Sequence, residues 1–404
     1  MKENTAFTNH QVAIIIGLAC LLFTVVLDYM LLPALSSTLL TALDLSTEEF
    51  GLIASAYAIS AGISAFVASG YADRFGRKPF LLFFYAGFLL GLLLCALAPS
   101  FELLLAARTI TGAFGGVVAS ITYALVTDMF PLQQRARVMG WLQSAFATSL
   151  VLGLPLALYI SATFSWQLSY WLVLSIGGLA LVMVNMIIKP QSDQSSKTTM
   201  TTPWEHAYQT IAQWKYWTVF TNNTLIVGGD IILMTFNATY MINNLGLTEE
   251  QLPFVYGAMG LTSMISSPIL GKLADRYGSL LVFIVGTLIA MVSVVAYANV
   301  PVSPMWIVIA LHIFIFIGIN ARMVTSVSLA TAIPGSKDRG SFMAIDASVQ
   351  QLAGGLAAAA AGFIVIQATD GHILNFPQIG WIVVSLMCLS AFMMYRINLL
   401  VNTA

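Results

Sequence analysis

The chain has 404 residues, of which 59% are hydrophobic and 8% are charged, and its formal net charge is −1. Soluble proteins carry about 25% charged residues, so this composition excludes a soluble domain with a single apolar anchor. The balanced charge also offers no basic surface for nucleic acid. Most of the chain is therefore expected to lie in a lipid bilayer, as an all-α membrane protein.

Twelve stretches are long and apolar enough to cross a bilayer, which takes about 20 mostly apolar residues. They divide into two six-helix halves, residues 1–189 and 216–404, with a polar linker over residues 190–215 that is expected to be cytoplasmic. The second part of the linker, from Trp204 to Trp217, is either an amphipathic helix on the membrane surface or a flexible loop. The predicted spans cover residues 11–36, 50–70, 79–99, 102–128, 137–161, 167–189, 216–243, 251–272, 279–300, 304–332, 341–367 and 377–397.

Lysine and arginine predict the orientation, because they concentrate in cytoplasmic connections. Arg108 and Arg322 lie inside predicted spans, and the other 16 − 2 = 14 lie at the termini or in the even-to-odd connections. The charged residues of the odd-to-even connections are all acidic: Asp44, Glu48, Glu49, Glu102, Glu249, Glu250 and Asp370. Both termini are therefore expected in the cytoplasm, in a multi-pass protein of the inner (cytoplasmic) membrane.

A charged turn recurs at half the chain length. Ser69-Gly-Tyr-Ala-Asp-Arg-Phe-Gly-Arg-Lys-Pro79 returns as Gly271-Lys-Leu-Ala-Asp-Arg-Tyr-Gly278, a shift of 275 − 73 = 202 residues. Ser46-Thr-Glu-Glu49 and Thr248-Glu-Glu-Gln251 are also 202 residues apart and have the form of a capping box. Internal repeats of this kind are a common plan of membrane transporters, and they predict two halves related by a pseudo-twofold axis.

These turns resemble the signature of the major facilitator superfamily between its second and third helices. The matching residues are Asp73, Arg74, Gly76, Arg77 and Lys78, and Ser69 stands where the signature has its first glycine. Arg108-Thr-Ile-Thr-Gly112 resembles a motif of proton-coupled members, and Gly153-Leu-Pro155 is similar to the drug and sugar efflux branch.

The resemblance implies the major facilitator fold and a conformational gate on the cytoplasmic side. The gate is expected to clamp the halves when the protein opens outward, whereas the alternative is that its basic residues only set topology. Its expected members are Asp73, Arg74, Gly76, Arg77 and Asp128, with Asp275 and Arg276 in the second copy.

Charged residues inside spans are costly, at least ~2.5 kcal/mol each, and mark function or a pair. Asp28 corresponds to Asp230 by the shift of 202, and Arg108 corresponds to His312 by a shift of 204. The repeat thus predicts two pairs, Asp28 with Arg108 and Asp230 with His312, and we expect them to couple protons to transport. Arginine stays protonated whereas histidine titrates near neutral pH. The alternative for the first pair is a structural ion pair between two helices.

A polar cavity is expected near these carboxylates. Arg322 and Asp346 have similar depths and are predicted to pair across the inner mouth, either as part of the cavity or as a helix-packing pair. The residues expected to line the substrate cavity are Tyr29, Met30, Asn222, Asn223, Met234, Asn237, Arg322, Asp346 and Gln350. The alternative is that they face lipid or only pack between helices.

The predicted function is proton-coupled efflux of small amphipathic compounds by alternating access. We expect a monomer that meets its substrate, protons and the bilayer, with the proton gradient as driving force and with no cofactor, metal or nucleic acid. The alternatives are a proton-coupled importer of a sugar or organic anion, and a lipid-type flippase. An enzyme is disfavoured, because the sequence has no zinc-type cluster, phosphate-binding loop or nucleophile elbow.

Overall fold

The computed structural model describes residues 7–69, 76–188, 210–334 and 339–403. Within these ranges the regular structure is helical, apart from one isolated bridge between Gln367 and Ile373. Twelve helices are long and apolar enough to cross a membrane, so the predicted all-α, twelve-span fold is confirmed. The predicted linker lies mostly outside the described residues, and with it the choice between a surface helix and a loop.

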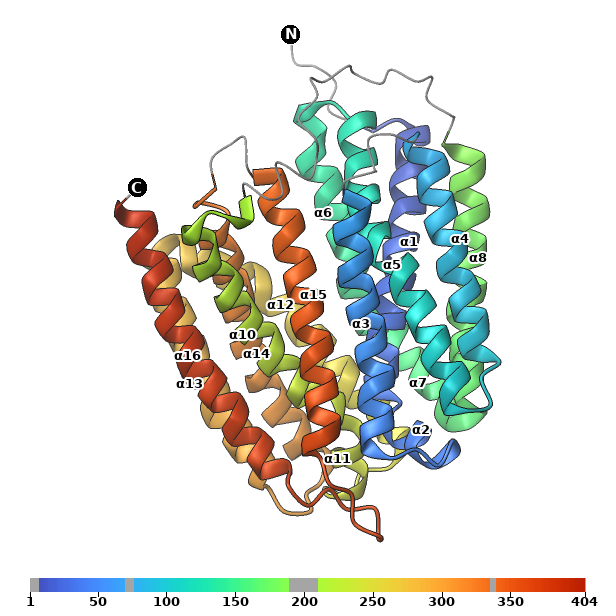
Figure 1. Ribbon diagram of the computed structural model, residues 1–404, viewed down its shortest axis with the longest axis vertical. Coiled ribbons are helices and arrows are strands. Elements are labelled where there is room, and N and C mark those ends of the chain that lie inside the picture. The colour runs from blue at the N-terminus through green and yellow to red at the C-terminus, as the bar shows by residue number, and fades with distance from the viewer. Residues whose placement is uncertain (1–6, 70–75, 189–209, 335–338, 404) are drawn as a thin grey trace.

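The spans run antiparallel to their neighbours in the chain (Figure 1). The first half contains α1 (Asn9–Ala34), α2 (Ser36–Ala42), α3 (Thr47–Ser69), α4 (Arg77–Ala96), α5 (Phe101–Met129), α6 (Leu132–Thr148), the π-helical turn η1 (Ser149–Gly153), α7 (Leu154–Thr163) and α8 (Trp166–Ile187). The second half contains α10 (Trp214–Thr235), α11 (Asn237–Asn243), the 3₁₀ turn η2 (Glu249–Gln251), α12 (Leu252–Tyr277), α13 (Ser279–Asn299), α14 (Met305–Ala330), α15 (Arg339–Ile364) and α16 (Phe376–Thr403).

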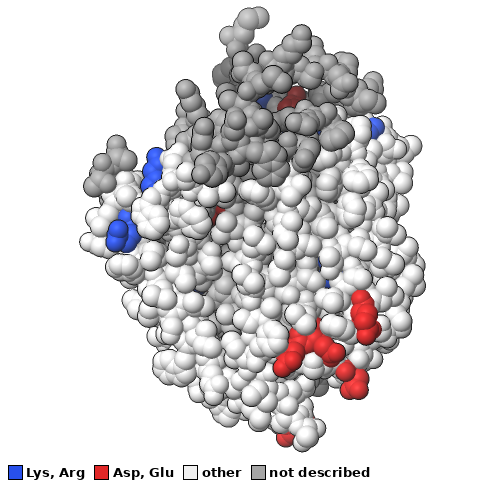
Figure 2. All heavy atoms as spheres, viewed as in Figure 1, with Lys and Arg blue, Asp and Glu red and all other residues white. Residues whose placement is uncertain are grey.

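The start of α1 and the end of α16 lie at one end of the bundle, which we call the terminal end (Figure 1). The short helices α2 and α11 lie at the opposite end. Figure 2 shows a surface with few charges, on which acidic side chains gather toward the opposite end and the visible Lys and Arg lie nearer the terminal end. The charge asymmetry along the sequence is thus an asymmetry between the two ends of the bundle.

Local sequence explains where several helices begin. The Ser46 hydroxyl accepts a hydrogen bond from the Glu49 amide at 3.1 Å, and the Glu49 carboxylate accepts one from the Ser46 amide at 2.9 Å. Thr248 and Gln251 form the same reciprocal pair before α12. Both predicted capping boxes are therefore confirmed, and they satisfy amide groups that helix starts leave unpaired.

The fifth span is interrupted by a π-helical turn. Pro155 has no N–H to donate to a carbonyl one turn earlier, and its ring crowds that carbonyl, so η1 accommodates an extra residue just before it. Gly260 of α12 packs on this turn, where an added Cβ would lie 2.7 Å from the carbonyl carbon of Leu150. The interruption is therefore also a contact between the two halves.

The two halves meet along α3 with α15 and along α12 with η1 and α7. Gly51 and Gly362 bring the backbones of α3 and α15 together, since a Cβ on Gly51 would lie 2.7 Å from the Gly362 Cα. Hydrogen bonds between described residues of the two halves lie at the opposite end: Thr38 to Glu249 at 2.9 Å, Thr239 to Ser36 at 2.8 Å, and Thr47 to the Val365 carbonyl at 2.9 Å. The structure is closed at the opposite end.

Candidate functional site

A buried ion pair joins α1 and α5 in the first half. Nη1 of Arg108 donates to Oδ1 of Asp28 at 2.6 Å, and the side chains are 1% and 0% exposed. The Tyr57 ring of α3 lies under the guanidinium at 4.5 Å, and the Tyr29 ring lies 5.5 Å from that of Tyr57. The predicted pairing of Asp28 with Arg108 is confirmed, and an aromatic face provides a second attraction for the cation.

This first pair is incompletely hydrogen-bonded. The second carboxylate oxygen of Asp28, Nε of Arg108 and the hydroxyl of Tyr170 are buried without a hydrogen-bond partner among the described residues. Desolvating two charges is costly unless their remaining donors and acceptors are satisfied. The pair therefore keeps free hydrogen-bonding capacity in the interior of the bundle.

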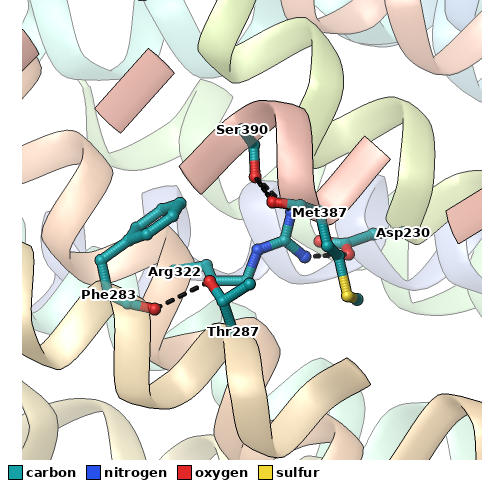
Figure 3. A network of polar contacts seen from close by, with 6 residues as sticks. All are labelled: Asp230, Phe283, Thr287, Arg322, Met387 and Ser390. Atoms are coloured by element: carbon teal, nitrogen blue, oxygen red, sulfur yellow. Dashed lines mark hydrogen bonds and ion pairs between the residues drawn. The ribbon is translucent and has the colours of Figure 1, made fainter. Parts of the chain in front are cut away.

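The second half also contains a carboxylate–arginine pair, but with a different partner. Nη1 of Arg322 donates to Oδ1 of Asp230 at 3.2 Å, and Nη2 lies 3.3 Å from the Ser390 hydroxyl of α16. Figure 3 shows the guanidinium between Asp230 and Ser390. The prediction that Asp230 pairs with His312 is therefore wrong.

The register of two antiparallel helices explains this correction. The Asn222 amide binds Ser326, and Asn237 binds His312, so α10–α11 and α14 run past each other with these residues level. His312 therefore lies 237 − 230 = 7 residues beyond Asp230, about 10 Å along a helix. Arg322 is closer, because its side chain leans toward the N-terminus of α14.

His312 belongs to a separate cluster of neutral groups. Its Nδ1 donates to the Val308 carbonyl at 2.8 Å, so Nε2 accepts from the Asn237 amide at 3.2 Å. The Tyr297 hydroxyl donates to Oδ1 of Asn237 at 2.6 Å, and its ring packs against the imidazole at 4.6 Å. Both ring nitrogens are thus satisfied in a neutral histidine.

Asp346 of α15 is buried among amides. Nδ2 of Asn223 lies 2.9 Å and 3.0 Å from the two carboxylate oxygens, and Nε2 of Gln350 donates to one of them at 2.8 Å. The predicted pair of Arg322 with Asp346 is wrong, because the lean of the arginine along α14 carries its guanidinium to Asp230. The Ser326 hydroxyl donates to Oδ1 of Asn223 at 2.8 Å and extends this network.

The other predicted cavity residues are partly buried. Tyr29, Met30 and Met234 are half-buried, and the Tyr29 hydroxyl approaches Gly354 of α15. A groove of about 750 Å³ lies elsewhere, between α3, α4 and α5, and is lined by Ser60, Ile63, Ser64, Val67, Ala68, Pro79, Phe80, Phe83, Phe84 and Ala113. None of the predicted cavity residues lines that groove.

The gate residues are described in part. Arg77 at the start of α4 forms an ion pair with Asp128 at the end of α5, and Gly76 is exposed just before α4. Asp73 and Arg74 lie outside the described residues. In the second copy, Asp275 and Arg276 are exposed in the last turn of α12.

Several members of these clusters were not predicted. Tyr57, Tyr297 and Ser390 come from helices whose contacts depend on tertiary packing and give no local signal. Ser326 carries a weak signal, because it lies four residues after Arg322 and therefore on the same helix face. Residues one turn from an intramembrane charge are thus worth adding to such a site.

A model of the Major Facilitator Superfamily (MFS) matches residues 17–358, and a second match covers residues 219–401. The chain is a member of the Major Facilitator Superfamily. It is an integral multi-pass membrane transporter, and the family consists of transporters and not of enzymes. Among the described residues, no group of three His, Cys, Asp or Glu side chains is arranged to hold a metal ion.

Relatives of this MFS protein include pumps. The uncharacterized MFS-type transporter YceJ of Bacillus subtilis (strain 168) is 26% identical over 271 residues, which are 66% of this chain and 68% of that protein. The efflux pump dotC of Dothistroma septosporum is 31% identical over 43% of this chain and 30% of the pump. Multidrug resistance protein 3 of Bacillus subtilis is 30% identical over 34% of this chain and 27% of that protein. The aligned part thus spans less than a third of each of the two pumps.

Solved MFS structures share the fold. A bacterial homolog of the human lysosomal transporter Spinster, inward-facing and unoccupied, matches with a TM-score of 0.73 at 15% identity and covers 98% of this chain and 97% of that chain. The nucleoside transporter NupG matches with a TM-score of 0.75 at 13% identity and covers 95% of this chain and 99% of that chain. At these identities the likeness shows the fold alone.

Proposed function

We propose that this MFS transporter exports small amphipathic compounds in exchange for protons, as a monomer in the inner membrane with both termini in the cytoplasm. The observation that carries the proposal is a buried carboxylate–arginine pair in each half, Asp28 with Arg108 and Asp230 with Arg322. Intramembrane ion pairs are costly and are typical of ion and substrate pathways. The names of dotC and of multidrug resistance protein 3 support the direction of transport.

The proposed mechanism is alternating access by the halves 1–189 and 216–404. In the state described, the opposite end is closed by hydrogen bonds between the halves. A substrate or a helix movement that separates Arg108 from Asp28 leaves a carboxylate without its cation in a medium of low dielectric. A carboxylate in that position takes up a proton instead of staying charged. Substrate and proton then exclude each other at the pair, as antiport requires.

The proposed substrate cavity consists of the predicted cavity residues, and His312, which was predicted to couple protons, joins it in another role. Tyr29, Met30 and Met234 supply adaptable apolar surface, and the amides of α10 and α11 supply polar contacts. His312 enters as a neutral hydrogen-bonded group and not as the partner of Asp230. At the terminal end, the ion pair of Arg77 with Asp128 joins α4 and α5 within the first half and is formed in the state described. The gate as a whole, with its second copy at Asp275 and Arg276, is proposed to stabilise the outward-open state.

Transport in membrane vesicles tests this proposal. Everted vesicles that contain the protein and have an acidic interior are expected to accumulate ethidium, which serves as an amphipathic probe. Collapse of the proton gradient is expected to release the ethidium. Asp28→Asn abolishes accumulation while the protein still inserts, and Asp44→Asn, at an exposed loop position, is the matched control. Accumulation by Asp28→Asn equal to that of the unchanged protein contradicts the assignment.

A lipid-like cargo is the second candidate. A triacylglyceride transporter of Mycolicibacterium hassiacum is 33% identical over 121 residues, which are 30% of this chain and 23% of that protein. The groove between α3, α4 and α5 is almost entirely apolar in its lining. Gradient-independent movement of a fluorescent triacylglycerol across reconstituted vesicles, without ethidium accumulation, favours this candidate.

A further inference from the structure

We infer that Asp346, with Asn222, Asn223, Ser326 and Gln350 around it, is a proton-binding site that is occupied in the state closed at the opposite end. This assignment deepens the proposed antiport, on which its transport role rests, because it names a proton carrier that belongs to neither ion pair.

Among the described residues, the interior of the bundle has one more carboxylate than it has cations. Among the described residues, the interior carboxylates are Asp28, Asp230 and Asp346, and the interior cations are Arg108 and Arg322. Each arginine binds one of the first two carboxylates. Asp346 is left without a cation although it is only 5% exposed. A buried carboxylate that lacks a counter-charge is neutralised, because its charged form is poorly solvated there.

Among the side chains that the structure describes, the elements packed around Asp346 do not bring another charge to it. On α14, Arg322 lies one turn before Ser326 and is directed to Asp230. On α10, Asp230 lies 230 − 223 = 7 residues from Asn223, about 10 Å along the helix. On α3, which packs on α15, the stretch from Phe50 to Ser69 contains no Asp, Glu, Lys, Arg or His, and its Tyr57 faces Arg108.

The polar network around Asp346 accommodates either protonation state. When Asp346 is ionised, Asn223 and Gln350 donate to it, Ser326 donates to Asn223, and Asn222 donates to Ser326 at 2.9 Å. This chain ends at Oδ1 of Asn222, a buried acceptor to which no described residue donates. When Asp346 is protonated, rotation of each side-chain amide group by 180° reverses the direction of these hydrogen bonds. The carboxylic O–H then donates to the Asn223 oxygen, and the Ser326 hydroxyl donates to the Asn222 oxygen.

The same donor set argues for a proton and against a metal cation. A metal cation is held by several oxygen ligands at once. Here amide N–H groups approach both carboxylate oxygens, and the oxygen of Asn223 is engaged by the Ser326 hydroxyl. Amides that donate to a carboxylate need only turn over to accept from a carboxylic acid, whereas a metal ion would have to displace them.

The position of Asp346 links its charge to movement of the halves. A Cβ on Gly62 of α3 would lie 3.1 Å from the carbonyl of Ser348, two residues after Asp346. The Asp346 side chain itself is directed to Asn223 of α10, about 200° around α15 from Ser348. Release of the proton therefore creates a negative charge between α15 and α10. This charge favours admission of water beside α15, the helix that forms the contact with α3, and protonation favours the closely packed state.

Infrared spectroscopy of the purified full-length protein tests the site without any substrate. At neutral pH we expect the C=O band of a buried, protonated carboxylic acid, which shifts in D₂O, shifts again with ¹³C-carboxyl aspartate, and disappears at alkaline pH. Asp346→Asn removes the band, Asp346→Glu moves it, and Asp44→Asn leaves it unchanged. A band that survives Asp346→Asn overturns the assignment. Absence of the band from the unchanged protein also overturns it, whether or not added Na⁺ stabilises the protein.

The transport arm separates this inference from the proposed function. Asp346→Asn is expected to lose gradient-driven ethidium accumulation and to retain downhill ethidium exchange. If the unchanged protein does not move ethidium in response to a proton gradient, the proposed function fails while the infrared result still decides the proton site. Gradient-driven accumulation that persists in a folded Asp346→Asn protein overturns the role of Asp346 in coupling.

Discussion

Arg322 binds Asp230 from a position ten residues further along α14 than the repeat assigns to it, since 322 − 312 = 10. The first half places its arginine at the eighth residue of α5, and the second half places His312 at the eighth residue of α14. The two halves therefore keep a carboxylate at the same position and neutralise it from different depths. This difference gives the two pairs unequal surroundings although the helices around them are equivalent.

Removing one member of the first pair is expected to destabilise the protein strongly. Arg108→Gln leaves Asp28 buried without its cation, and breaking a buried pair in this way costs about 3–5 kcal/mol. The double variant Asp28→Asn with Arg108→Gln is expected to regain most of that loss, because no isolated charge remains. Unfolding in detergent, analysed as a double-mutant cycle, measures both. Equal stability of the single and double variants contradicts the prediction.

The ring of Tyr57 is expected to matter more than its hydroxyl. Tyr57→Phe keeps the aromatic face under Arg108, whereas Tyr57→Leu removes it and loses about 1–2 kcal/mol of desolvated cation–π attraction. Thermal unfolding of the two variants side by side provides the comparison. A loss of the same size in Tyr57→Phe shows that the contact of 4.5 Å is not the source of the stability.

His312 is expected not to set the pH dependence of transport. Both of its ring nitrogens are engaged in a neutral ring, so His312→Gln leaves the midpoint of the pH–rate profile unchanged. Asn237→Ala, by contrast, removes the partner of the Tyr297 hydroxyl and of Nε2 of His312, and is expected to cost about 1–3 kcal/mol of stability. A shifted midpoint in His312→Gln restores histidine as a proton carrier.

Contact between α3 and α15 is expected to require glycine at position 51. In Gly51→Val the side chain meets the Gly362 backbone, so closure at the opposite end is disfavoured. Spin labels at positions 42 and 250, which are exposed on the two halves at that end, are expected to move apart. Gly178→Val is the control, because a Cβ there meets no atom within 4 Å. Unchanged label distances in Gly51→Val contradict the prediction.

The fold and the first ion pair could be predicted from the sequence, because both follow from patterns that can be recognised without knowledge of the tertiary packing. Apolar length defines the spans, and the repeat matches Asp28 with Asp230 and Arg108 with His312, which suggests the pairing of Asp28 with Arg108. The partner of Asp230 depends on the register of α10 against α14 and on the lean of a long side chain, which no periodicity records. The amide network of Asp346 includes residues of three helices. Most of its members could therefore be predicted as polar cavity residues, but their hydrogen bonds to one another could not.

The contact between α3 and α15 has a mechanical consequence. Gly51 lies against Gly362, and a Cβ on Gly355 would lie 3.0 Å from the Ile59 amide nitrogen, so the two helices touch through their backbones along much of their length. Leu352 of α15 packs against Gly62, and Ile59 of α3 packs against Gly355, so side chains fill the space that these glycines leave. In the proposed alternating access, hydrogen bonds at the opposite end, such as that from Thr38 to Glu249, would have to break before the interior could face the other side of the membrane.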